Sequence, residues 1–110
     1  AQRLREFAKE RDWEQFHTLK NLMVSLSLEA SELLEHAQWK DDNELNEFVR
    51  TPDGIVNIAD ECADIFVYLL MICHECKIDI LNATRDKLNK NSNKYPIEKS
   101  IGSAKKYTEL

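Results

Sequence analysis

The chain has 110 residues, enough for one small domain, and oligomerisation would help it to bury more apolar surface. Its 15 basic and 20 acidic residues give a net charge of −5, which disfavours binding to a nucleic-acid polymer or an anionic membrane. With 2 glycines, 2 prolines and apolar residues that recur at helical intervals, the composition predicts an all-α fold.

The first part of the chain predicts two helices. Residues 3–15 have the pattern of a short amphipathic helix, which breaks at residues 16–18. Thr18 is a suitable N-cap for a longer helix over residues 19–39, where apolar side chains recur every three or four positions. We expect this second helix to face the core.

A short helix and a second long helix are predicted next. The polar residues 40–44 should end the preceding helix and lead into a short helix over residues 45–49. The sequence Thr-Pro-Asp-Gly at residues 51–54 predicts a turn. Residues 55–75 then predict a helix that is apolar nearly all round, as expected of an element surrounded by others.

The end of the chain predicts one more helix and a tail. Asp79 can cap a helix over residues 80–91, and residues 97–110 show no clear period and predict an irregular tail. We expect residues 1–110 to form a single domain. The longest apolar run, residues 65–73, is far shorter than the roughly 20 residues that a membrane-spanning helix needs. A cytoplasmic location is the default expectation.

Two acidic pairs with the same spacing are the most informative feature of the chain. Glu29 and Glu32 lie at the edge of the apolar stripe on one long predicted helix, and Glu61 and Asp64 lie on the other. A separation of three places both members of a pair on one helix face. Two antiparallel helices could therefore direct four carboxylates into one gap.

Such a cluster needs positive charge. Residues 24–38 and 51–75 contain no lysine or arginine that could neutralise it. A divalent cation with oxygen ligands would relieve both the repulsion and the cost of desolvation, and Mg²⁺ suits a few carboxylates together with substrate phosphates. The pairs therefore predict a magnesium site used in phosphate chemistry.

Other interpretations of the same residue types were weighed. Acidic pairs at this spacing are also common on solvated helices. A di-iron carboxylate bundle needs two Glu-x-x-His motifs, and only Glu14 and His17 fit that pattern, at a predicted helix break. The cysteines are odd in number, which argues against a disulfide framework, and Cys62 and Cys73 are expected to pack in the core.

Six further residues are candidates for contacting a substrate. They are Trp13, His17, Trp39, Tyr68, Lys87 and Asn91. The three aromatic rings could stack on a base, although an aromatic residue at a helix end also serves as a core residue. The lysine and the asparagine, four residues apart, could hold phosphate oxygens, although a lysine-rich surface helix looks the same. The histidine could contact substrate or cap a helix.

The acidic pairs resemble the hallmark of the all-α nucleoside triphosphate pyrophosphohydrolases of the MazG type. That hallmark is E-x-x-E, followed on the next long helix by E-x-x-D. Residues 11–16, Arg-Asp-Trp-Glu-Gln-Phe, and residues 106–110, Lys-Tyr-Thr-Glu-Leu, are similar to the dCTP pyrophosphatase branch. The likeness covers almost the whole chain.

The resemblance implies cleavage of dCTP or a modified dCTP to the monophosphate and pyrophosphate, as part of nucleotide-pool sanitation. Glu29, Glu32, Glu61 and Asp64 would hold Mg²⁺ and form the catalytic centre. The aromatic candidates would contact base and sugar, and the lysine and asparagine would reach the phosphates. Leu4 departs from the polar residue expected in some relatives, which leaves base selectivity open.

The resemblance also implies an oligomeric assembly, and two alternative functions remain. We expect a MazG-like helical bundle in which residues 19–39 and 55–75 form a metal-bearing hairpin, assembled as a homodimer or homotetramer with sites near subunit interfaces. A broader hydrolase of noncanonical triphosphates is one alternative. A non-enzymatic helical interaction module, whose acidic residues merely line a partner-facing groove, is the other.

Overall fold

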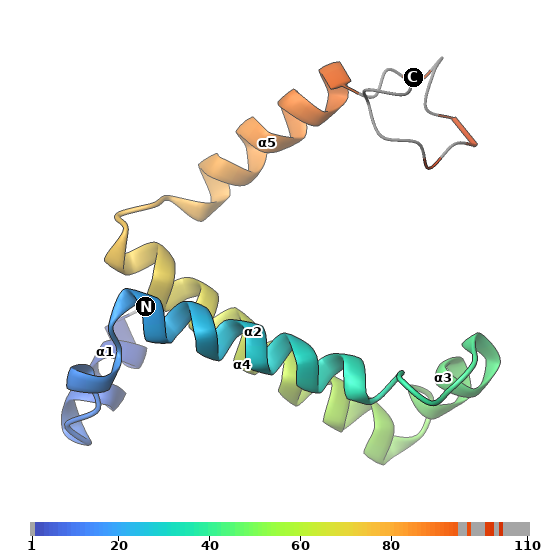
Figure 1. The fold of residues 1–110 in the computed structure, drawn as a ribbon, viewed down its shortest axis with the longest axis horizontal. Coiled ribbons are helices and arrows are strands. Elements are labelled where there is room, and N and C mark those ends of the chain that lie inside the picture. The colour runs from blue at the N-terminus through green and yellow to red at the C-terminus, as the bar shows by residue number, and fades with distance from the viewer. Residues whose placement is uncertain (1, 95–96, 98–100, 103, 105–110) are drawn as a thin grey trace. The chain divides into compact units, whose positions relative to one another are not determined.

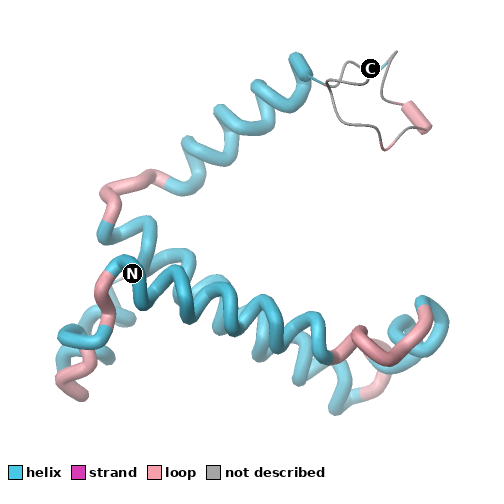
Figure 2. The backbone as a smooth tube through the Cα atoms, viewed as in Figure 1, coloured by secondary structure: helices cyan, strands magenta, loops and turns pink. Residues whose placement is uncertain are grey.

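A computed structural model describes residues 2–94, 97, 101–102 and 104 of the chain. All the elements formed by these residues are helices, as the sequence predicts, and no strand occurs among them (Figure 1, Figure 2). The elements are α1 (Gln2–Glu10), the 3-10 helix η1 (Glu14–Phe16), α2 (Leu19–Glu35), α3 (Asp42–Phe48), α4 (Pro52–Glu75) and α5 (Ile80–Lys94).

The chain divides into two compact units, residues 1–77 and residues 78–110, which are described separately. The first contains α1 to α4, and the second contains α5. The expectation of a single domain over residues 1–110 stays a prediction. The irregular tail expected over residues 97–110 lies mostly outside the described residues.

The first unit is built on a hairpin of α2 and α4, which lie side by side and antiparallel, with α3 in the connection between them (Figure 1). The side chain of Thr18 caps α2 by accepting the Asn21 N–H at 3.2 Å, as predicted. Asp41 caps α3 by accepting the Glu44 N–H at 2.8 Å, and the Glu44 side chain bonds back to the Asp41 backbone. Both α2 and α3 therefore start at well-defined positions.

Two predicted helix ends are wrong by about one turn. The first helix ends at Glu10 rather than at residue 15, because Asp12 has a φ of 53° and reverses the chain before η1. The second helix ends at Glu35 rather than at residue 39. There, the amino group of Lys40 donates to the backbone carbonyl of His36 at 2.7 Å. In a longer helix, this carbonyl would instead accept a backbone N–H from the next turn.

The predicted turn at residues 51–54 is the first turn of α4 instead. Thr51 is the N-cap, its hydroxyl accepts the Gly54 N–H at 3.0 Å, and Pro52 occupies the first helical turn, where its missing N–H costs nothing. At the other end of the chain, α5 continues to Lys94 because no strong helix breaker precedes Pro96. Asp79 caps α5 as predicted, accepting the Asn82 N–H at 3.2 Å.

The buried apolar core of the described residues is small and consists of Ala8, Leu22, Ile72 and Cys73. These residues lie where α1 meets the start of α2 and the end of α4. Cys73 is buried as expected, whereas Cys62, also expected in the core, is exposed. No helix in the described part of the chain combines the length and hydropathy that a bilayer span requires.

Candidate active site

The two long helices bring three of the four paired acidic residues together. Glu29 and Glu32 of α2 and Glu61 of α4 each offer one carboxylate oxygen, and these oxygens all lie within 4.8 Å of one another. We call these three residues the acidic cluster. Asp64, one turn further along α4, stands outside this set but lines a cavity together with Glu29.

The cluster has the properties of a cation site. Oε2 of Glu29 and Oε2 of Glu61 are both buried, and neither has a hydrogen-bond partner among the described residues. Buried anionic oxygens without partners are costly, because they lose water and gain nothing in exchange. An oxygen-preferring divalent cation would satisfy both atoms, so the residues present fit such an ion.

Within the cluster, the carboxyl group of Glu29 has a raised pKa. Burial, the largest cause, raises the pKa of this carboxyl from 4.5 to about 7, with further contributions from a hydrogen bond with Glu32 and from the charges of Glu32, Asp64 and Glu61. Without a cation, the cluster therefore tends to hold a proton near neutral pH. A divalent ion would compete with that proton for the same site.

A histidine that the sequence reasoning did not select stands next to the cluster. Nε2 of His36 lies 3.7 Å from Oε1 of Glu61, and both side chains are largely shielded from solvent. A signal for this contact was present in the sequence. His36 follows Glu32 by four residues and Glu29 by seven, so the three share one face of the helical path.

Beside the cluster, α1, α2, α4 and the residues that flank η1 line an open cavity of about 170 Å³. Trp13, His17 and Tyr68, three of the predicted substrate residues, line it together with Glu29 and Asp64. The remaining wall is mostly apolar and consists of Leu4, Phe7, Ala8, Val67 and Met71. The lining of the cavity therefore combines aromatic side chains with two carboxylates.

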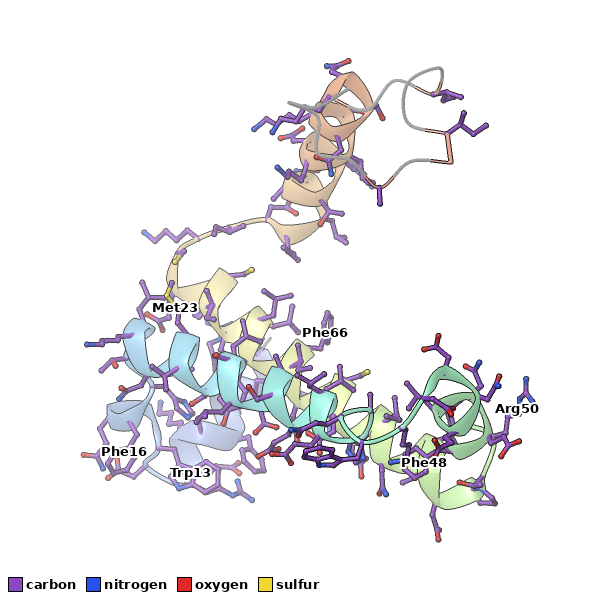
Figure 3. All side chains as sticks on the ribbon, turned by 45° about the vertical axis from the view of Figure 1, so that its right-hand side comes forward. Trp13, Phe16, Met23, Phe48, Arg50 and Phe66 are labelled. Atoms are coloured by element: carbon purple, nitrogen blue, oxygen red, sulfur yellow. The ribbon has the colours of Figure 1, made fainter. Side chains whose placement is uncertain are left out.

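Trp13 is held in place by local contacts. Its backbone N–H donates to the carbonyl of Ala8 at 2.9 Å, and its ring meets the ring of Phe7 edge-to-face at 5.6 Å. The guanidinium of Arg11 lies 3.6 Å from the centre of the Phe7 ring. Figure 3 shows Trp13 and Phe16 at the same end of the hairpin. The Trp13 side chain is still 45% exposed, so part of its ring remains free.

Trp39, another predicted site residue of the first unit, does not line this cavity. Trp39, after the end of α2, is 86% exposed. Lys87 and Asn91 lie one turn apart on α5 in the second unit, and their proposed contacts with phosphate stay predictions. Glu35 is exposed at the end of α2.

Comparison with known proteins now places the chain in a family. Residues 24–110, which include both acidic pairs, match the family model described as MazG-like. The chain belongs to the MazG-like family. The matched span thus covers the acidic cluster and all of α4, whereas Trp13, between α1 and η1, precedes it.

Individual relatives of this MazG-like chain are similar over most of its length. It is 42% identical to dCTP pyrophosphatase 1 of Bos taurus and 39% identical to that of Homo sapiens, over 105 residues in each case. These alignments cover 96% of this chain but 62% of each relative, so the chain spans less than two thirds of their length. The structure of a pyrophosphatase from Archaeoglobus fulgidus superposes with a TM-score of 0.77 at 41% identity, covering 84% of this chain and 85% of that one.

Proposed function

We propose that this protein is a Mg²⁺-dependent nucleoside triphosphate pyrophosphohydrolase that converts dCTP or a modified dCTP to the monophosphate and pyrophosphate. The observation that carries this proposal is the junction of the acidic cluster with a cavity lined by Trp13 and Tyr68. A cation site next to aromatic faces suits a ligand with a polyphosphate at one end and a flat base at the other. The similarity to dCTP pyrophosphatases supports the choice of substrate.

In this proposal, Glu29, Glu32 and Glu61 hold Mg²⁺ and Asp64 completes the site from the edge of the cavity. When bound, magnesium would neutralise the negative charge of the triphosphate and activate the attacking water. The carboxylates would fix where the ion sits, and the buried oxygens of Glu29 and Glu61 would hold it on the side away from solvent.

The remaining candidate residues act on the nucleotide itself. Trp13 and Tyr68 stack against the base and sugar, and His17 closes the same wall of the cavity. Lys87, Asn91 and Trp39 are proposed to contact phosphates and base by similarity to the family. The resulting role is nucleotide-pool sanitation in the cytoplasm.

A panel of triphosphates tests the choice of substrate. We expect pyrophosphate release with Mg²⁺ to be at least about tenfold faster, in kcat/KM, for dCTP and 5-methyl-dCTP than for dTTP, dATP and dGTP. Equal turnover of all of them would instead favour the second candidate, a broader hydrolase of noncanonical triphosphates. Leu4 supports this candidate, because an apolar side chain in the cavity wall cannot hydrogen-bond to a particular base.

Two charge-neutralising substitutions distinguish an enzyme from a non-enzymatic interaction module. We expect Glu61→Gln and Asp64→Asn to abolish turnover while the fold is retained in circular dichroism. An interaction module predicts unchanged Mg²⁺ affinity and a more stable fold, because repulsion falls and nothing is lost. Glu35→Gln is the matched control, since Glu35 is exposed on the same helix as Glu29 and should keep full activity.

Self-association is proposed from the outer face of α4. Ile55, Ala59 and Phe66 are exposed there at helical spacing, with Ile55 51% and Phe66 55% exposed (Figure 3). Met23 and Leu28 are similarly exposed on α2. Exposed apolar side chains on both helices of a hairpin suit a second copy of the same hairpin, which would give a homodimer or a homotetramer.

A further inference from the structure

His36 occupies a position between the acidic cluster and an apolar groove. Its Nε2 lies 3.7 Å from Oε1 of Glu61, and the two side chains are 23% and 19% exposed. The other oxygen of this carboxylate, Oε2, is buried and has no hydrogen-bond partner among the described residues. One oxygen of Glu61 thus faces the imidazole, and the other is left for a different partner.

The imidazole is held in its orientation by contacts outside the cluster. Its ring stacks on Phe48 with centroids 5.9 Å apart and an angle of 19° between the planes. Lys40 donates to the backbone carbonyl of His36 at 2.7 Å, and its amino group lies 4.6 Å from the centre of the Phe48 ring. The end of α2 and the end of α3 together fix where the histidine points.

Packing alone does not call for a histidine here. The groove next to His36 is lined otherwise by apolar side chains, including Leu33, Leu45, Val49 and Ile58. A leucine at position 36 would suit such surroundings at least as well as an imidazole. The polar atom that distinguishes histidine from leucine is the one that faces Glu61.

We propose that His36 is a positioning residue for the metal centre, which holds Oε1 of Glu61 so that Oε2 is presented to the cation. This inference rests on the proposed function, because it needs the acidic cluster to bind a metal ion. Carboxylates that ligate metals are commonly held by such outer partners, and losing one typically weakens metal affinity about 10- to 100-fold.

The test is direct metal binding by the full chain, with Mn²⁺ as the probe and electron paramagnetic resonance as the readout of free ion. We expect His36→Leu to weaken Mn²⁺ binding by about tenfold or more, and His36→Gln, whose amide can reach the same carboxylate, to restore it to within about threefold of the unmodified protein. Val49→Ala is the matched control, because it trims the same groove without touching Glu61.

The outcomes separate this inference from the proposed function. If the unmodified protein binds no Mn²⁺, both fail. If it binds Mn²⁺ and His36→Leu binds equally well, the metal site stands and the role of His36 is refuted. A His36→Gln variant as weak as His36→Leu, or a Val49→Ala variant weakened to the same degree, also refutes the positioning role, because the effect then comes from packing.

Discussion

The electrostatic cost of bringing the carboxylates together is seen in the raised pKa of Glu29. Its pKa, raised to about 7 chiefly by burial, means that the metal-free site can lower its own charge by keeping a proton. Metal binding at neutral pH must therefore displace a proton or follow its loss. The affinity for Mg²⁺ should rise with pH through this range.

The same shift predicts how the stability of the metal-free protein depends on pH. In the folded chain Glu29 keeps its proton up to about pH 7, whereas its ordinary pKa is 4.5. Between these values the folded state binds more protons than the unfolded state, so the free energy of unfolding should decrease as pH rises through this window. Thermal unfolding in EDTA, from about pH 4.5 to about pH 8, measures this slope.

Glu29→Gln isolates the contribution of this residue. The amide cannot titrate, so the decrease in stability across the window should be smaller than in the unmodified protein, while Glu35→Gln should leave the decrease unchanged. Identical pH profiles for the unmodified protein and Glu29→Gln would contradict the assignment. Saturating Mg²⁺ should stabilise the unmodified protein most at the high-pH end, because the ion binds the deprotonated site.

The spacing of acidic residues was sufficient to predict that carboxylates from the two long helices converge. A separation of three reliably places Glu29 and Glu32 on one face, and the two long helices do bring Glu61 to them. The same rule could not show that Asp64 faces the cavity instead, because the axial offset of two helices depends on their packing. His36 was missed because only Glu-x-x-His spacing was tested, whereas it lies four residues after Glu32.

At the scale of elements, the joint between α3 and α4 controls how the hairpin closes. Gly54 is buried in the first turn of α4, against the end of α3. A Cβ at this position would overlap the backbone carbonyl oxygen of Phe48 and come within 2.6 Å of the Thr51 hydroxyl. Backbone cannot move aside as a flexible side chain can, so a glycine is required here for close approach.

Gly54→Ala should therefore destabilise the protein. Replacing glycine by alanine inside a helix usually stabilises by about 0.5–1 kcal/mol, but the overlap with Phe48 should reverse the sign and lower the free energy of unfolding by about 2 kcal/mol. Urea denaturation measures the difference. Asp60→Ala, at an exposed position on the same helix, should change stability by less than about 0.5 kcal/mol. A Gly54→Ala variant more stable than the unmodified protein would refute the close contact.

The helices were predictable from sequence more reliably than their ends. The 3.6-residue period of apolar side chains identified α1 to α5, because burial of one face is the dominant local signal. Residues 51–54 were assigned to a turn because Pro and Gly are typical of turns, yet here Thr51 caps a helix and Pro52 begins it. The sequence contains little indication of the positive φ of Asp12, because aspartate adopts this conformation more often than most other residues but still only in a minority of cases.

At the scale of the whole molecule, the chain exposes more apolar surface than a free monomer should. Phe66, Val56 and Ile55 on α4 are each more than half exposed, although the sequence predicted that this helix would be surrounded. The sequence indicated correctly that the face is apolar. It could not show what covers the face, because an apolar pattern marks a surface for burial without identifying its partner.

Phe66→Glu tests the association. A carboxylate on this apolar face should convert the proposed homodimer or homotetramer to monomers and lower the melting temperature, because burying it against an apolar partner is costly. Size-exclusion chromatography with light scattering measures the mass. Asn43→Glu, which adds the same charge on α3, is the control and should leave the mass unchanged. A monomeric unmodified protein would contradict the proposed assembly.

The uneven placement of the small core has a consequence for how the hairpin responds to magnesium. Leu22 and Ile72 join the helices near α1, but between Glu29 and the α3 connection no side chain of α2 or α4 is fully buried. In the absence of the ion, backbone amides in that half should open to hydrogen exchange before those around Leu22. Binding of a cation at the proposed site would then fold this half of the hairpin locally. The cation would hold α2 and α4 together there, as buried apolar side chains do near α1.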